Sequence, residues 1–191
     1  MKTLTRAIAF GFIFAPVLAE AHPGHSASGL TSGFAHPLTG WDHLLAMVAV
    51  GLWAAQLGGR ARWQVPAAFV GVMILGGLAG MGGVVVPAVE QGIIASVLVF
   101  GVLIAAAVRL PVSASMAIVG VFAFFHGVAH GTEMPAGVNG LNYAAGFTLA
   151  TALLHLGGLS LGMMGARAHQ PRLVRAVGGA MAVCALLLGV S

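Results

Sequence analysis

Charged side chains are nearly absent along the 191 residues of this chain, 59% of which are hydrophobic. Asp, Glu, Lys and Arg make up only 6% of the sequence, whereas a soluble domain carries about 25%. Too few charges are present to cover a surface that faces water, so lipid must surround most of the chain. The net charge of +4 is then explained by arginines that flank the helices, and we expect no binding to nucleic acid.

Six apolar stretches each come close to the roughly 20 residues that a helix needs to cross a bilayer. We expect spans over residues 41–57, 65–86, 93–109, 113–130, 141–165 and 174–190, joined by short segments that leave no room for a second domain. The predicted fold class is an all-α membrane protein with six transmembrane helices. Residues 38–191 would form its single transmembrane domain, and residues 22–37 a periplasmic N-terminal segment.

The first 21 residues are typical of a cleavable signal peptide. Lys2 and Arg6 precede an apolar run that is too short to span comfortably, and Ala19-Glu20-Ala21 gives the small-x-small cleavage pattern. Cleavage would leave the mature N-terminus in the periplasm.

Charge placement gives an independent check on this orientation. If the mature chain begins outside, the predicted cytoplasmic segments carry all the remaining arginines, which are Arg60, Arg62, Arg109, Arg167, Arg172 and Arg175. Glu90 and Glu133 fall on the periplasmic side. This distribution follows the positive-inside rule, so we expect both termini in the periplasm and a multi-pass protein of the bacterial inner membrane.

Ionisable side chains inside such spans are informative because each is costly, about 2.5–3.5 kcal/mol for a central Asp. Here they are residue types that bind metals, and they gather at the predicted outer ends of the first and fourth spans. The set comprises His36, Asp42 and His43, then His126, His130 and Glu133, and finally His155, midway along the fifth span.

Helical spacing places three of these residues on one stripe. At 100° per residue, His126 and His130 lie about 40° apart and Glu133 returns to within about 20° of His126. A His pair at i and i+4 with a carboxylate one turn further can chelate a borderline metal ion. Because the first span enters from the side where the fourth leaves, both groups should lie at the same membrane depth.

Each residue taken alone has a simpler interpretation. These alternatives are a helix-capping box for Asp42, hydrogen bonds between helices for His126, His130 and His155, solvation for Glu133, and a structural position in a loop before Pro37 for His36. These separate roles together explain the grouping of the residues less well than one metal ion that they all bind. At the mature N-terminus, His22 and His25 could collect metal in the periplasm; a terminal tail without a metal role is the alternative.

At the two motifs the sequence resembles the HupE/UreJ family of hydrogenase and urease accessory permeases. The matching residues are His36-Pro37, Asp42-His43 and Met47, followed by the block Phe125-His126-Gly127-Val128-Ala129-His130-Gly131-Thr132-Glu133. The likeness extends over the signal peptide and the six-span layout. It implies secondary uptake of nickel, sometimes of cobalt. The first motif is also similar to the signature of larger nickel/cobalt transporters, although its spacing is one residue longer.

We therefore interpret the chain as a permease, not an enzyme, that passes a divalent nickel or cobalt ion inward to His155. The ion would be a transported substrate, with no tightly bound cofactor, and the absence of a Walker-type sequence points to the membrane potential as the driving force. The alternatives are an intramembrane zinc hydrolase with Glu133 as general base, a haem protein, and a non-transporting metal sensor or accessory protein. Neither the preferred metal nor the oligomeric state follows from the sequence.

Overall fold

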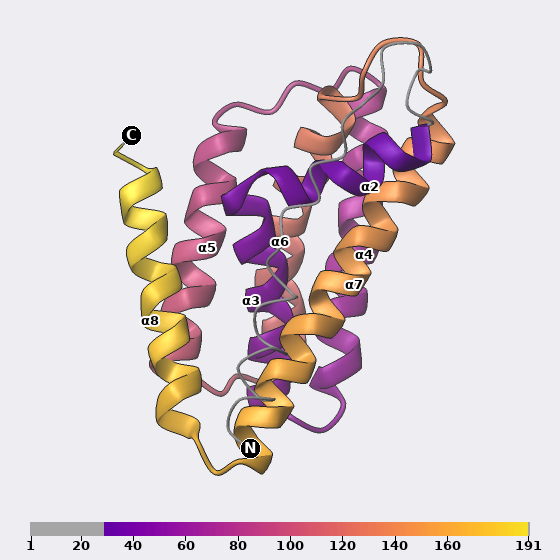
Figure 1. Cartoon of the computed structure of the whole chain (residues 1–191). Helices are drawn as coiled ribbons and strands as arrows, with labels where there is room; N and C mark the ends of the chain where they lie inside the picture. Colours follow the sequence, from indigo (N-terminus) through magenta and orange to yellow (C-terminus); the bar gives the residue numbers. More distant parts are fainter. Residues whose placement is uncertain (1–28, 191) are drawn as a thin grey trace, which may run out of the picture.

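A computed structural model describes residues 29–190, and all regular elements in this part of the chain are helices (Figure 1). They are α2 (Gly29–Thr39), α3 (Trp41–Leu57), α4 (Ala61–Met81), α5 (Val89–Ala105), α6 (Val112–Thr132), α7 (Gly140–Arg167) and α8 (Pro171–Leu188). The predicted all-α class is confirmed for these residues. The predicted signal peptide lies outside them.

Length and composition support fewer than six spans. Helices α4, α6, α7 and α8 are long and apolar enough to cross a membrane, and the bent pair α2–α3 could make a fifth span. Helix α5 is apolar but has 17 residues, about 25 Å at 1.5 Å per residue, against a hydrocarbon core of about 30 Å. The chain is thus a multi-pass membrane protein, while the six-span layout and the side on which each terminus lies stay predictions.

Helix α2 lies across one end of the bundle and turns by 84° into α3 (Figure 1). Gly40 separates the two helices in an extended conformation, and the Thr39 hydroxyl donates to the His36 carbonyl 2.8 Å away. Our prediction that His36 lies in a loop was therefore wrong, because α2 continues through Pro37. Packing on α7 overrides the local effect of the proline: a Cβ on Gly33 would overlap the backbone of Tyr143.

Glycines bring the helices into pairs with almost touching backbones. Between α4 and α6, a Cβ on Gly127 would overlap the Met73 carbonyl oxygen, and one on Gly131 would overlap that of Gly77. The same relation joins α3 to α7, where a Cβ on Gly51 would overlap the His155 carbonyl. Helices in lipid associate through close backbone contacts of this kind, because moving an apolar side chain from lipid into the protein gains little free energy.

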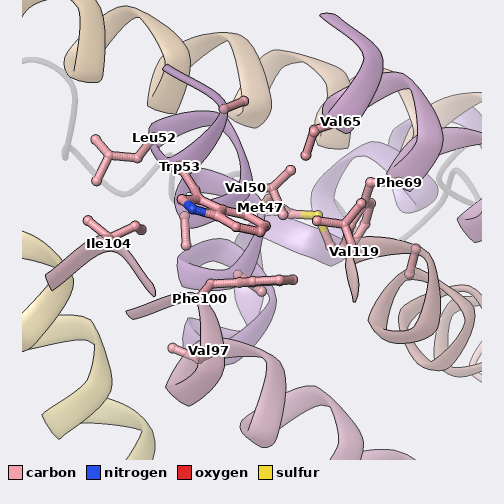
Figure 2. Packing of buried hydrophobic residues seen from close by; sticks show 14 of the residues in the cluster. Met47, Val50, Leu52, Trp53, Val65, Phe69, Val97, Phe100, Ile104 and Val119 are labelled. Carbon is pink, nitrogen blue, oxygen red and sulfur yellow. The ribbon is translucent and has the colours of Figure 1, made fainter. Parts of the chain in front are cut away.

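A hydrophobic core fills the centre of the bundle below the level of α2. Figure 2 shows Trp53 of α3 beside Phe100 and Ile104 of α5, and the Trp53 and Phe100 rings stack with centroids 6.4 Å apart. Large apolar side chains also point outward, as Leu75 and Leu187 do, each 63% exposed. An outer surface of this kind suits lipid contact.

Candidate metal centre

Three helices deliver a histidine each to one small volume at the end of the bundle covered by α2. His36 comes from the last turn of α2, His43 from the first turn of α3 and His130 from the last turn of α6. One ring nitrogen of each lies within 4.8 Å of those of the other two. This spacing allows a single cation to contact all three with small side-chain adjustments. The two sequence motifs thus meet at the same end of the bundle, as expected.

A fourth histidine adjoins this group. The ring centroid of His126 lies 5.1 Å from that of His43, and His43 and His130 are 5.0 Å apart. His36 and His130 are closer still, at 4.9 Å. The i, i+4 pair on α6 therefore faces both other helices. We call these four residues the His cluster.

The glycine after each α6 histidine explains why both rings face the same way. Gly127 and Gly131 lie against the backbone of α4, so the residue before each of them is rotated by about 100° away from that contact. His126 and His130 consequently project toward α2 and α3. The repeated His-Gly pair of α6 is the sequence signal for this orientation of the ligands.

Hydrogen bonds fix which nitrogen of two rings can bind a cation. Nδ1 of His126 lies 2.9 Å from the Phe122 carbonyl oxygen, and Nδ1 of His43 lies 3.0 Å from Oδ1 of Asp42. Carbonyl and carboxylate oxygens accept, so each Nδ1 carries the proton and each Nε2 keeps its lone pair. Oδ1 of Asp42 also accepts from the backbone N–H of His43, at 2.7 Å. Metal-ligating histidines are commonly oriented in this way.

The structure does not use Asp42 as a helix cap. Residue Gly40 occupies the N-cap position of α3 without a side-chain hydrogen bond, and the Thr39 hydroxyl is bonded within α2 instead. The capping-box alternative is therefore wrong. Asp42 instead orients His43, while its second oxygen remains available.

Buried nitrogens without partners distinguish the cluster from ordinary packing. Within the described part of the chain, Nε2 of His43, Nε2 of His126 and both nitrogens of His130 have no hydrogen-bond partner. His126 and His130 are fully buried. An unpaired buried polar group costs about 1–3 kcal/mol, and most such groups in proteins find a partner. The interhelical hydrogen bonds considered for His126 and His130 are not formed.

Glu133 closes the solvent side of the cluster. It follows the last residue of α6, and Nε2 of His36 donates to its Oε2 at 3.0 Å. This hydrogen bond lowers the pKa of the Glu133 carboxyl, against the opposing effect of burial, so the carboxylate is ionised at neutral pH. The Glu133 side chain is 44% exposed and that of His36 is 24% exposed. Solvation alone therefore does not describe Glu133.

His155 lies apart from the cluster, behind an aromatic ring. The Phe69 ring is 5.5 Å from that of His126 on one side and 5.0 Å from that of His155 on the other. Both nitrogens of His155 are buried without a partner among residues 29–190. Nearby in sequence, Thr151 donates to the sulfur of Met73 at 3.5 Å. The structure thus brings His155 to a second position, separated from the first by Phe69.

Sequence reasoning missed three aromatic residues at the site, because an aromatic ring in an apolar run looks like ordinary core. Phe69 is one of them. Phe147 stacks on His130 at 4.9 Å, and Tyr143 lies edge-on to His36 at 6.2 Å. The Tyr143 hydroxyl is buried without a hydrogen-bond partner in the described residues. Tyr143 is the single tyrosine of the chain, and this was the sequence signal that could have indicated a role at the site. His22 and His25 lie outside the described residues.

The sequence matches a known family over nearly its whole length. The model described as HupE / UreJ protein covers residues 10–188. Protein HupE of Rhizobium leguminosarum bv. viciae is 44% identical over 176 residues, which cover 91% of this chain and 92% of that protein. No solved structure matches the chain significantly.

Proposed function

Because the chain belongs to the HupE/UreJ family, we propose that it is a secondary permease for a divalent transition metal in the bacterial inner membrane. Nickel is the first candidate for the transported ion and cobalt the second. The observation that carries the proposal is the His cluster, whose buried imidazole nitrogens have no protein partner among residues 29–190. A cation that sheds its water needs such lone pairs as replacements.

The chemistry of the donors fits nickel or cobalt better than a hard cation. Imidazole suits zinc, copper, iron and nickel, whereas magnesium and calcium prefer sites made only of oxygen ligands. The described part of the chain brings no thiolate to the cluster, since its free cysteine, Cys184, lies in α8 and is exposed. A site without thiolates holds the ion less tightly, which favours release and therefore transport.

Exposure falls along the direction in which the ion would move. The side chain of Glu133 is 44% exposed, that of His36 24% and that of His43 9%, while His126 is fully buried. The ionised Glu133 attracts the hydrated cation at the rim. Its hydrogen bond occupies Nε2 of His36 and leaves Nδ1 with a lone pair. Water is then exchanged for imidazole stepwise instead of all at once.

Passage beyond the cluster requires the Phe69 ring to turn aside. That ring is in contact with His126 and with His155, so it blocks the direct way between them. His155 then offers two buried nitrogens as the next ligands. In this scheme His155 is the next ligand on the inward path, and His22 and His25 collect the metal outside.

The membrane potential is a sufficient driving force. A divalent cation gains about 4.6 kcal/mol per 100 mV when it moves to the negative side, at about 2.3 kcal/mol per charge. We propose this source because the sequence contains no phosphate-binding loop of the Walker type.

One observation also favours a second candidate, a zinc-dependent hydrolase. A carboxylate beside a His cluster is the arrangement of a general base next to a bound metal, and Glu133 holds that place. Two cavities among the described residues lie away from Glu133, one between α4 and α7 around Ala145 and the other near Gln56. Permeation is therefore the better supported proposal, and a non-transporting metal-binding accessory protein is the remaining alternative.

Uptake of radioactive nickel tests the proposal in cells that lack their own nickel importers. We expect accumulation with the wild-type chain and loss of it in His126→Ala and His130→Ala. His169→Ala is the matched control, because His169 is exposed in the α7–α8 connection at the opposite end of the bundle. Excess cobalt or zinc in the medium ranks the competing ions. If the correctly inserted wild-type protein accumulates no nickel, or if both cluster variants accumulate it normally, the proposal fails.

A further inference from the structure

The end of the bundle opposite the His cluster is basic and carries no carboxylate among residues 29–190. The arginines of this part of the chain all lie there, at the ends or starts of helices: Arg60, Arg62, Arg109, Arg167, Arg172 and Arg175. The described carboxylates lie at the other end, Asp42 and Glu90 in the first turns of α3 and α5 and Glu133 after α6. No protein anion within these residues can neutralise the arginines.

A cavity of about 190 Å³ opens among these arginines. Gln56 of α3, Arg109 of the α5–α6 connection and Arg175 of α8 supply its polar lining, and Gly162 and Ala166 of α7 form a smooth wall. At about 30 Å³ per water molecule, the volume equals about six waters. It is large enough for a phosphate with a small substituent and too small for most drug-sized ligands.

The Arg175 side chain is held in place, and both arginines keep donors free. Nε of Arg175 donates to the Ala105 carbonyl at 2.7 Å, which leaves the terminal NH2 groups of its guanidinium for a ligand. The backbone beside Arg109 is fixed because the buried Trp53 indole donates to the Val108 carbonyl at 3.1 Å. Among the described residues, the exposed Arg109 side chain has no hydrogen bond or ion pair. Two guanidinium groups with free donors on one cavity suit a phosphate.

Gln56 adds a requirement that a bare phosphate does not meet. Its Nε2 donates to the Ile104 carbonyl at 3.2 Å, so its Oε1 can only accept, and this oxygen is buried without a partner in the described residues. The ligand should therefore combine an anion with a hydroxyl donor. The two helices that line the cavity also expose apolar side chains, Leu161 on α7 and Leu173 on α8, each next in sequence to a lining residue.

We propose that this cavity binds the headgroup of an anionic phospholipid that carries a free hydroxyl, with phosphatidylglycerol as the simplest example. The phosphate contacts Arg109 and Arg175, a glycerol hydroxyl donates to Oε1 of Gln56, and the acyl chains follow the apolar faces of α7 and α8. Basic pockets between transmembrane helices bind lipid headgroups in this way. The site would fix α8, whose closest packing is with α5, to the rest of the bundle.

Native mass spectrometry of the purified full chain with equimolar phosphatidylglycerol and phosphatidylcholine tests the site. We expect the wild-type chain to retain phosphatidylglycerol preferentially. Arg109→Gln and Arg175→Gln should each lower that preference about fivefold. Arg172→Gln is the matched control, because Arg172 is exposed on the same end without lining the cavity, and it should retain the preference. An equal loss in all three variants, or no preference in the wild type, would overturn the proposal.

Two further comparisons in the same assay identify the chemical class of the ligand. The wild-type chain should bind phosphatidylglycerol better than phosphatidylethanol, a phosphodiester of the same charge without a headgroup hydroxyl, and Gln56→Leu should abolish this difference while still preferring phosphatidylglycerol over phosphatidylcholine. Equal retention of the two anionic lipids by the wild type refutes the hydroxyl contact. Soluble glycerol phosphate should not displace the lipid at equal concentration; if it does, a soluble anion is the ligand and the lipid assignment is wrong.

Discussion

Replacing Gly80 by alanine should damage the metal centre without touching any of its ligands. Gly80 lies on α4 where it crosses α6, and a Cβ there would come within 2.6 Å of the Val128 carbonyl oxygen and 3.1 Å of the Thr132 nitrogen. Both atoms belong to the backbone and cannot rotate away. Because ordinary contacts begin at 3.4 Å, the helices must separate locally by about 0.8 Å to accept the methyl group.

The expected size of the effect follows from this displacement. His130 lies between the two backbone positions that move, and its ring nitrogen belongs to a group that spans only 4.8 Å. Functional sites tolerate shifts of about 0.5 Å, and a displacement near 1 Å can cost about a hundredfold. We therefore expect Gly80→Ala to weaken nickel binding about tenfold to a hundredfold. Overpacking should also destabilise the fold by about 1–3 kcal/mol, of which the better helix propensity of alanine offsets at most about 1 kcal/mol.

Gly71→Ala is the matched control, since Gly71 lies on the same helix with nothing within 4 Å of its added Cβ. Thermal unfolding in detergent and competition of nickel with a chelating dye would measure both effects. The control should unfold at or above the wild-type temperature and bind nickel normally. If Gly80→Ala matches Gly71→Ala in both assays, the close crossing of α4 and α6 does not position the histidines.

Three further predictions concern the ligands themselves. Asp42→Asn should weaken nickel binding about tenfold to a hundredfold, as measured by the same competition assay, because the carboxylate that orients His43 loses its charge. His155→Ala should bind nickel normally but slow its uptake, since His155 lies beyond Phe69; an unchanged uptake rate would remove it from the path. Nickel affinity should also fall as the pH decreases through the pKa of Glu133, which the hydrogen bond from His36 lowers from its ordinary value of 4.5, because the protonated carboxyl no longer attracts the cation; an equal fall over this range in Glu133→Gln would contradict this role.

The sequence predicted those features of the site that depend only on the period of the α-helix and on the alternation of the spans. The i, i+4 spacing predicted that His126 and His130 share one side of a helix, and both rings of α6 face the cluster, while Glu133 is the residue that follows the helix. The alternating topology predicted that the two groups of residues would lie at the same depth, and in the structure the rings of His43 and His126 lie 5.1 Å apart. Both inferences needed only the helical period and an alternating topology.

Features that depend on tertiary packing could not be predicted. Pro37 suggested a loop, yet α2 is helical through it because Gly33 fits against α7. Asp42 matched a capping box, but the 84° turn at Gly40 gives the cap position to glycine. Phe69 has the sequence context of a core residue, and only the fold places its ring between two histidines.

Nickel flux into vesicles that contain only the purified protein and lipid tests directly whether this chain is a metal permease. A nickel-sensitive dye inside the vesicles would report the ion after a negative interior potential is imposed. We predict flux that grows with the potential, falls to the protein-free level in His130→Ala and persists in His169→Ala. Vesicles that hold correctly folded wild-type protein and show no flux above the protein-free level would contradict the assignment of this chain as a metal permease.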